Sequence, residues 1–395
     1  MTERQNSILA VKGIEDGIIS DEALQDFEKR VGMELRVNNI FNELASKDAI
    51  RKFADGIGDE NPLWRDESYA NQSPYRGIAA PPSWLNSVFP TWVLQGLKGV
   101  HAIHASTEWE FYRPVYLNDT IRPECYFSGF EVKNSSFAGR TVIERQEARY
   151  YNQNGELVAV ARPVGFRTER RATRENKLYM DIQLPHPWTE QELAQIEDQI
   201  LKEEIRGSKL RFWEDTEPGD LLPPIAKGPL GLTDVIAYCI GAAPVAIKAH
   251  ASSLKIYGQH PAWCFRDPYS FALEPIYGVH YNQMAAQDCG LPYPYDIGVQ
   301  RHCWLIQLLT NWMGDYGWLK RNYAKYAKFV FFSDVVKLSG KVVRKYRDDE
   351  GEYCVDIATK AINQRGEDVM PGTATIVLPR KRNLLCALEK RLRSV

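Results

Sequence analysis

Several features that would assign a function directly are missing from this chain of 395 residues. Its longest apolar stretches fall well short of the about 20 residues that a membrane-spanning helix needs. There is no excess of one charge, because 49 Lys and Arg face 51 Asp and Glu, for a net charge of -2. The N-terminal MTERQNSILAVKG has no apolar core of a signal peptide. We therefore expect a soluble, cytoplasmic protein that binds neither nucleic acid nor a membrane.

Common motifs of metal and cofactor sites are also missing. The seven cysteines are scattered without CxxC spacing, which favours reduced thiols over disulfides or a zinc site. No GxGxxG, HExxH, GxSxG or phosphate-binding loop is present. His101 and His104 form a two-histidine cluster without a nearby acidic or cysteine partner, which makes it a weak metal site. We expect no metal and no redox cofactor.

Aromatic residues are plentiful, with 10 Trp, 20 Tyr and 15 Phe. A hydrophobic content of 44% and a charged content of 25% are typical of soluble globular proteins. The length is sufficient for two or three domains with a large core. Large rings in a sheet-rich core explain most of the aromatic residues, and aromatic-lined grooves are the alternative.

An internal repeat is visible in the sequence. Residues 152–158, NQNGELV, match residues 363–369, NQRGEDV, at an offset of 211. Trp64, Asp66 and Ala70 fall on His280, Asn282 and Ala286 at an offset of 216. Such small differences in the offset are expected when two copies of one unit differ by insertions or deletions of a few residues. The chain therefore carries the same fold twice.

Each copy combines helices with strand-like runs. Residues 46–57 have helical spacing, with Ser46 or Asp48 as the N-cap. The segments 83–96 and 299–314 are apolar on most sides, which is expected for a helix wrapped by a sheet, although Pro90 should kink or end the first. Alternating strands follow each segment, and the turn at 152–155 predicts a hairpin. A long central helix inside a curved antiparallel sheet is the expected unit.

The segment Gly58-Asp59-Glu60-Asn61-Pro62-Leu63-Trp64-Arg65-Asp66 follows the first helix. It resembles the active-site loop of the MaoC-like, (R)-specific enoyl-CoA hydratases. The resemblance implies an α+β chain of two tandem hotdog folds that pair edge to edge as a pseudo-dimer. We predict an N-terminal hotdog domain at 1–170, a charged helical linker at 171–206 and a C-terminal hotdog domain at 207–395.

In the resembled family a catalytic Asp is followed five residues later by a catalytic His. Asp59 and Asn61 match this loop, but Trp64 stands at the position of the histidine. An indole N–H donates hydrogen bonds and cannot accept a proton. The first copy should therefore be a degenerate half in which Asp59, Asn61 and Trp64 contact substrate at most. A turn residue bonded to its own backbone is the alternative interpretation of Asp59.

The second copy has the histidine and lacks the carboxylate. His280, followed by Tyr281-Asn282, matches the segment that carries the family's catalytic His, whereas Ala242-Ala243-Pro244 stand where its Asp is expected. The intervening segment 242–279 offers two carboxylates, Glu274 and Asp267. Glu274 lies six residues before His280 and is our preferred partner. A solvated loop carboxylate and a buried structural histidine are the alternative interpretations.

The resemblance also implies a backbone N–H that binds the thioester oxygen at the start of the central helix. Gly298 matches this glycine, and Gly77 is our expected counterpart in the first copy. Either could instead be a turn glycine. Asn282, Tyr295 and Gln300 are expected to line the substrate pocket, and His302 is expected to be structural.

The resemblance implies reversible hydration of an enoyl-CoA to a 3-hydroxyacyl-CoA, with His280 and Glu274 as acid–base groups and Gly298 as the oxyanion donor. CoA would enter as part of the substrate, with no separate cofactor. Two alternatives stay open: an acyl-CoA thioesterase, and a non-catalytic acyl-CoA-binding partner subunit. A fused pair already satisfies the basic hotdog dimer, so further homo-oligomerisation is compatible with this prediction and is not required by it.

Overall fold

The fold was analysed in a computed structural model that describes residues 13–38, 40–135, 139–176, 179–243 and 247–392. The elements of the first half are α2 (Asp21–Glu28), β1 (Glu34–Leu35), α3 (Lys47–Ile57), η1 (Pro62–Trp64), α4 (Glu67–Gln72), η2 (Pro82–Trp84), α5 (Leu85–Val88), β2 (His101–Phe111), β3 (Arg122–Ser135), β4 (Gly139–Tyr151) and β5 (Leu157–Thr168).

Two helices follow the first half, α6 (Arg170–Asn176) and α7 (Glu190–Leu201). The elements of the second half are η3 (Trp213–Asp215), β6 (Ile225–Lys227), α8 (Leu232–Ala242), α9 (His250–Gln259), η4 (Pro261–Trp263), β7 (Cys264–Arg266), β8 (Leu273–Pro275), η5 (Ile276–His280), α10 (Gln283–Asp288), α11 (Gly298–Met313), β9 (Trp318–Lys325), β10 (Val336–Arg347), β11 (Tyr353–Asn363) and β12 (Gly372–Val377).

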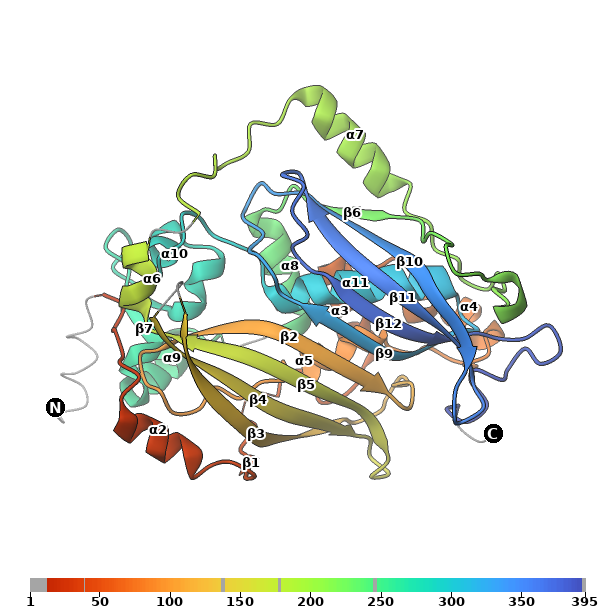
Figure 1. The fold of residues 1–395 in the computed structure, drawn as a ribbon, viewed down its shortest axis with the longest axis horizontal. Helices are drawn as coiled ribbons and strands as arrows, with labels where there is room; N and C mark the ends of the chain where they lie inside the picture. Colours follow the sequence, from red (N-terminus) through yellow and green to blue (C-terminus); the bar gives the residue numbers. More distant parts are fainter. Residues whose placement is uncertain (1–12, 39, 136–138, 177–178, 244–246, 393–395) are drawn as a thin grey trace.

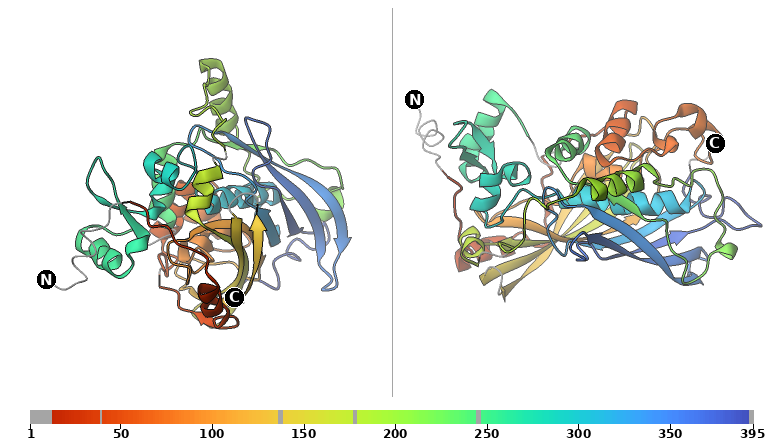
Figure 2. Two further views of the ribbon diagram at one scale, coloured as in Figure 1. Left: turned by 60° about the vertical axis from the view of Figure 1, so that its left-hand side comes forward. Right: turned by 90° about the horizontal axis from the view of Figure 1, so that it is seen from above.

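The strands of both halves form one antiparallel sheet in the order β1-β3-β4-β5-β2-β9-β12-β11-β10-β6 (Figure 1). The two half-sheets meet where β2 pairs with β9, from Ser106 opposite Lys325 to Glu110 opposite Arg321. Seen from above, the larger helices gather on one face of this sheet (Figure 2). The predicted α+β class with two tandem hotdog folds joined edge to edge is confirmed.

Helix α11 is the central helix of the second half. All of its residues after Gly298 are buried, including polar side chains such as Gln300, His302 and Asn311. A helix that is buried all round must be enclosed by other elements, and here it contacts strands β9 and β10 of its own half-sheet. The predicted central helix at 299–314 is therefore correct to within one residue.

The central helix predicted for the first half is wrong in length. η2 and α5 together end at Val88, and Phe89 is extended, as the residue before a proline prefers. Pro90 cannot continue the helix, so an irregular segment follows up to β2. The buried Arg167 guanidinium donates to the carbonyl oxygens of Gln95 and Leu97 in that segment, at 3.0 and 3.2 Å. Polar groups of the half-sheet thus replace the hydrogen bonds that a helix would have made.

The internal repeat is confirmed by matching hydrogen bonds in two turns. The N–H of Asn152 donates to Glu156 O at 3.0 Å, and the N–H of Asn363 donates to Glu367 O at the same distance. The next residue of each turn is a glutamine whose side-chain amide donates to a buried aspartate, Asp119 in the first half at 2.8 Å and Asp334 in the second at 2.6 Å. The same side chains therefore stabilise both copies in the same way.

Helices α3 and α8 are equivalent and pack against each other across the two halves. Ser46 caps α3 as predicted, by accepting from the N–H of Ala49 at 3.1 Å. Gly56 and Gly241 are each the tenth residue of their helix. A Cβ added at Gly56 would lie 2.7 Å from Ala237 O, and one added at Gly241 would lie 2.5 Å from Lys52 O. Two glycines thus allow the helices to approach each other closely.

Between the half-sheets the chain passes through α6 and α7, and α7 lies beside the edge strand β6, which it contacts (Figure 1). Helix α7 begins with a capping box, in which Thr189 and Glu192 are bonded reciprocally. A second insertion, α9 with the β7–β8 hairpin, separates α8 from the loop that carries His280. The domain limits 1–170, 171–206 and 207–395 stay predictions. None of the described helices is both long and apolar enough to cross a membrane.

Candidate functional site

Each half contains a short 3-10 helix followed by a capped α-helix at the position of the predicted active-site loop. In the first half η1 ends at Trp64, and Asp66 caps α4 by accepting from the N–H of Tyr69. In the second half η5 ends at His280, and Asn282 caps α10 by accepting from the N–H of Ala285. The structure therefore brings Trp64 and His280 to equivalent positions, as the sequence offset predicted.

The first-half loop is closed upon itself. Asp59 is 1% exposed and accepts from the N–H of Asn61 and from the indole N–H of Trp64, both at 3.0 Å. Asn61 in turn accepts from the N–H of Leu63. Burial raises the pKa of Asp59 to about 6, and these two hydrogen bonds oppose the rise. The predicted trio is assembled, but its polar atoms bond to one another.

The first half also lacks the backbone donor that we predicted at Gly77. The two halves have equivalent backbone hydrogen bonds just before η2 and α11. The N–H of Ala80 donates to Val115 O, and the N–H of Asp296 donates to Val330 O, each at 2.8 Å. This register aligns Pro82 with Gly298, each the first residue of its helical segment. Gly77 lies five residues before Pro82 and donates to Ala70 O. Because proline has no N–H, the first half cannot supply the predicted donor, and the assignment of Gly77 is wrong.

A small apolar cavity remains beside the first-half loop. Its volume is about 30 Å³, and its lining includes Trp64, Tyr75, Pro81, Pro82 and Met313. A site of this size accommodates about two water molecules and is far smaller than the about 300 Å³ of a small-molecule pocket. The first half, as described, therefore has no room for an acyl group at this position.

His280 in the second half has a defined tautomer. Its Nδ1 lies 3.0 Å from the backbone oxygen of Tyr295. A carbonyl oxygen only accepts, so Nδ1 carries the proton and Nε2 is the unprotonated, basic nitrogen. Burial lowers the pKa of His280 to about 4, against the opposing effect of the backbone contacts at Tyr295 and Asp296. The ring is also held edge-on against Tyr277 and Tyr295, at centroid distances of 4.7 and 4.8 Å.

The predicted pairing of His280 with a carboxylate is absent. Among the described residues, no Asp or Glu oxygen lies within 4.0 Å of a ring nitrogen of His280. Glu274 instead accepts from the hydroxyl of Tyr281 at 3.3 Å. Position 244, where the register of α3 and α8 places the counterpart of Asp59, lies outside the described residues.

Asp267 has a positioning role in the insertion that precedes His280. One of its oxygens accepts from the N–H groups of Tyr269 and Ser270, and the other accepts from the Asn282 side chain at 2.9 Å. These hydrogen bonds lower the pKa of Asp267. Since Asn282 also caps α10, the β7–β8 hairpin is fastened to the loop that carries His280. Asn282, predicted to bind substrate, is occupied by this link.

Gly298 is the first residue of α11, so its N–H has no partner within that helix. A Cβ at this position would lie 2.8 Å from the Tyr326 ring. The Tyr326 hydroxyl lies 3.0 Å from Nδ1 of His302, and the other ring nitrogen of His302 lies 2.5 Å from Asn322 Oδ1. His302 is 1% exposed and has the structural role that we predicted.

Of the two other residues predicted to line the pocket, Tyr295 lies next to His280 and Gln300 does not. Tyr295 lies in the site, where its ring and its carbonyl oxygen both contact His280. Gln300 is 1% exposed and donates to the Asp234 carbonyl oxygen at 3.0 Å. It therefore ties α11 to α8 and does not face the loop of His280.

First-half residues complete the surroundings of the second-half site. His104 in β2 stacks on Tyr326 at 5.2 Å and packs against Trp92 at 5.2 Å. Burial lowers the pKa of His104 to about 3, so the imidazole is neutral. Sequence reasoning singled out His104 only as a weak metal ligand and missed Tyr326. The β2–β9 pairing between the halves brings the two together, and no local sequence pattern encodes it.

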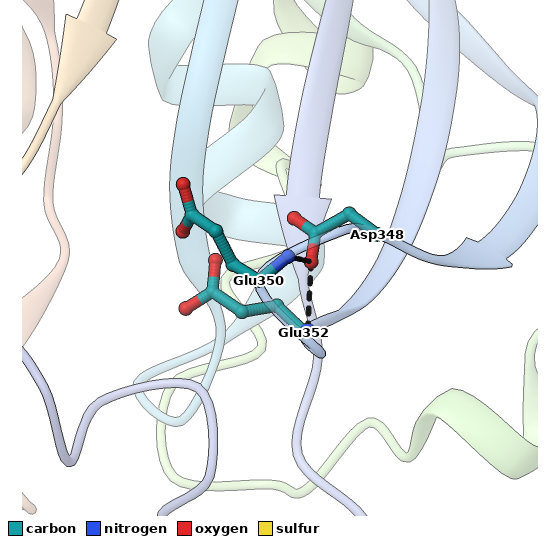
Figure 3. Close-up of side chains that lie close together, drawn as sticks. All are labelled: Asp348, Glu350 and Glu352. Atoms are coloured by element: carbon teal, nitrogen blue, oxygen red, sulfur yellow. Dashed lines mark hydrogen bonds between the residues drawn. The ribbon is translucent and has the colours of Figure 1, made fainter.

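The three carboxylates closest to a metal-ligand arrangement in the described chain are Asp348, Glu350 and Glu352, at the β10–β11 turn (Figure 3). The Lys320 ammonium bonds to all three, at 2.7, 3.0 and 2.9 Å. Arg391 also pairs with Glu352 at 2.7 Å. The cluster is therefore an ion-pair network whose centre holds a lysine.

Comparison with known families supports the resemblance. Residues 30–161 match the model of the FAS1-like, dehydratase domain region. A UPF0336 protein of Parafrankia sp. strain EAN1pec is 28% identical over 125 residues, which are 29% of this chain and 76% of the relative. A UPF0336 protein of Streptomyces avermitilis is 25% identical over 122 residues, covering 29% of this chain and 78% of the relative.

Solved structures show the same fold over nearly the whole chain. A MaoC-like dehydratase aligns with a TM-score of 0.60 at 15% identity, covering 89% of this chain and 99% of that one. A putative MaoC domain protein dehydratase from Chloroflexus aurantiacus aligns with a TM-score of 0.53 at 12% identity, covering 89% and 96%. The predicted resemblance to the MaoC-like dehydratases is confirmed. Together with the family model, it supports a hydratase or dehydratase activity in general.

Proposed function

We propose that this chain is a hydro-lyase that adds water reversibly to an enoyl-CoA thioester, and that its one working site is in the second half. The observation that carries the proposal is the position of His280. Its Nδ1 is fixed on the carbonyl oxygen of Tyr295, and Tyr295 lies three residues before Gly298, which supplies the first N–H of α11. The contact therefore holds the histidine against the segment that leads into α11. At the equivalent positions of the first half, Trp64 stands in place of the histidine and Pro82 has no N–H.

The proposed reaction uses His280 for both proton transfers. Nε2 takes a proton from a water molecule as its oxygen attacks the β-carbon of the enoyl group. The electron pair of the double bond moves toward the thioester oxygen, where the Gly298 N–H stabilises the negative charge. The imidazolium then returns the proton to the α-carbon. One water is consumed in total, and the histidine ends in its starting state.

The test measures hydration of crotonyl-CoA by the loss of enoyl-thioester absorbance. We expect His280→Ala to lower kcat/KM at least about 100-fold, as loss of a general acid–base group does. The matched control is His260→Ala, because His260 is exposed and stacks on Trp263 in the insertion away from the loop. Equal activity of the two variants would remove His280 from the mechanism.

A non-catalytic acyl-CoA-binding subunit is the second candidate function. It is favoured by the lack of a carboxylate within 4.0 Å of His280 among the described residues. Binding of crotonyl-CoA without turnover, across short and long enoyl chains, would support it. Release of free CoA, followed in the same assay with a thiol reagent, would instead indicate a thioesterase.

A further inference from the structure

One buried arginine differs from all other buried arginines in the described part of the chain. Three of the four have a carboxylate partner: Arg167 with Glu144 at 3.3 Å, Arg301 with Asp296 at 3.3 Å, and Arg391 with Glu352 at 2.7 Å. Arg170 is 4% exposed, and no Asp or Glu oxygen in the described chain lies within 4.0 Å of it.

The guanidinium of Arg170 has few partners in the described chain. One terminal nitrogen donates to the carbonyl oxygen of Glu15, and the buried Nε has no acceptor among the described residues. The carboxylates of Glu15 and Asp16 pair with Lys98 and Arg174 instead. Buried charges are normally paired, because removing a charge from water costs several kcal/mol. The Nε atoms of Arg167 and Arg301 also have no acceptor, so what sets Arg170 apart is the missing carboxylate. A buried guanidinium without one indicates an anion that the described part of the chain does not itself provide.

Two polar side chains next to Arg170 are also without partners. His101 in β2 lies opposite Thr168, the last residue of β5 and two residues before Arg170. His101 is 6% exposed and Thr168 is 2% exposed. Neither Nδ1 of His101 nor the hydroxyl of Thr168 has a hydrogen-bond partner in the described chain. A neutral imidazole and a hydroxyl can both donate to the same anion as the guanidinium.

These residues lie beside the candidate active site. Helix α6, which begins with Arg170, packs against Gly290 just after α10, where a Cβ would lie 2.8 Å from Thr173 C. Arg174 on the same helix donates to the Asp288 carbonyl oxygen at 2.8 Å. Helix α10 in turn packs against both α6 and η5, which ends at His280. The unpaired groups thus belong to the same region as the proposed base.

We infer that Arg170, His101 and Thr168 bind an anionic group at the far end of the acyl chain, such as a carboxylate. This rests on the proposed hydratase function and narrows its substrate class to acyl groups that carry a negative charge. The burial of Arg170 favours the acyl end over the CoA phosphates, because the large polar nucleotide of CoA stays near the protein surface. A bound carboxylate would complete the charge pairing that the other three buried arginines already have.

The test compares enoyl-CoA substrates that differ only at the far end, one with an ω-carboxylate and one with a methyl group. We expect the wild-type kcat/KM to be about 10- to 100-fold higher for the carboxylate, the range of hydrogen bonds to charged groups. Arg170→Met should abolish this preference and leave turnover of the methyl substrate within about threefold. The matched control is Arg171→Met, because Arg171 is exposed and its one ion pair among the described residues is with Glu175 on the same helix.

The outcomes are separable from those of the proposed function. Hydration of both substrates at equal rates by the wild type would overturn the inference and leave the hydratase function standing, whether or not the Arg170 variant folds. A preference for the carboxylate that persists in Arg170→Met would overturn it as well. If Arg170→Met weakens both CoA substrates equally but leaves their pantetheine thioesters unchanged, the anion is a CoA phosphate. No hydration of any substrate would reject the hydratase function itself.

Discussion

Gly298 and Pro82 occupy equivalent positions in the two halves. Gly298 is the first residue of α11, and Pro82 is the first residue of η2. The same backbone hydrogen bonds precede both residues, so the two positions differ in one respect that concerns chemistry, the presence of an N–H. Together with the exchange of His280 for Trp64, this difference removes both proposed catalytic groups from the first half.

Pro82 suggests a variant that tests the oxyanion donor. Proline is favoured at the first position of a helix, so Gly298→Pro should keep α11. The N–H is lost, and we expect kcat/KM for crotonyl-CoA to fall about 100- to 1,000-fold. Gly298→Ala is the matched control, because its Cβ meets the same Tyr326 ring at 2.8 Å while the N–H remains. Equal losses in the two variants would show that crowding by Tyr326, and not the N–H, matters.

The pH dependence of turnover tests the state of His280. Because burial lowers its pKa to about 4, the neutral, basic form should dominate at neutral and mildly acidic pH. We expect kcat/KM to stay constant between pH 8 and about pH 5.5, where an ordinary histidine of pKa about 6.5 would already be mostly protonated. A fall to half activity near pH 6.5 would contradict this placement of His280. Circular dichroism over the same range verifies that the fold is intact.

The sequence alone was sufficient for the repeat and for the equivalence of Trp64 and His280. Both depend on local signals, namely a turn of defined residue types and a capped helix after a short loop, and these signals survive gaps elsewhere. The buried helix α11 was also predictable, because a segment that is apolar on most sides and has no internal proline has few alternatives.

The carboxylate partner and the first-half donor were not predictable from the sequence. Glu274 lies close to the expected spacing from His280, but the β7–β8 hairpin directs its carboxylate to Tyr281. Gly77 was predicted because it is a glycine before an apolar segment, whereas the backbone hydrogen bonds place Pro82 at the position equivalent to Gly298. In both cases tertiary pairing decides the register, and residue type alone does not reveal it.

The buried histidines should make stability depend on pH. Burial lowers the pKa of His101 to about 3 and of His302 to about 4, both below the about 6.5 of an unfolded chain. The unfolded state therefore binds more protons between these values, so stability is full above about pH 6.5 and decreases as the pH falls. Each histidine should lower the free energy of unfolding by up to about 1.4 kcal/mol per pH unit.

Urea denaturation of the wild type and of His101→Leu between pH 7.5 and pH 5 measures this contribution. We expect the slope of stability against pH to be smaller in the variant by about one proton. Nδ1 of His101 has no hydrogen-bond partner to lose in the described chain. Identical slopes would mean that the pKa of His101 is the same in the folded and unfolded states.

Gly56 and Gly241, which each face the backbone of the opposite helix, should be essential for the packing of α3 against α8. An alanine at Gly241 would place its Cβ 2.5 Å from Lys52 O and 2.6 Å from Phe53 Cα, both of them backbone atoms that cannot rotate away. Overpacking costs about 1–3 kcal/mol, and the better helix propensity of alanine returns up to about 1 kcal/mol. We expect Gly241→Ala, measured by thermal and urea unfolding, to be destabilising on balance. Gly77→Ala is the control, because no atom lies within 4 Å of its added Cβ.

Combining Gly241→Ala with Gly56→Ala should destabilise the protein by less than the sum of the two single variants, because one separation of the helices relieves both contacts. Strict additivity would indicate that the two glycines do not share one interface.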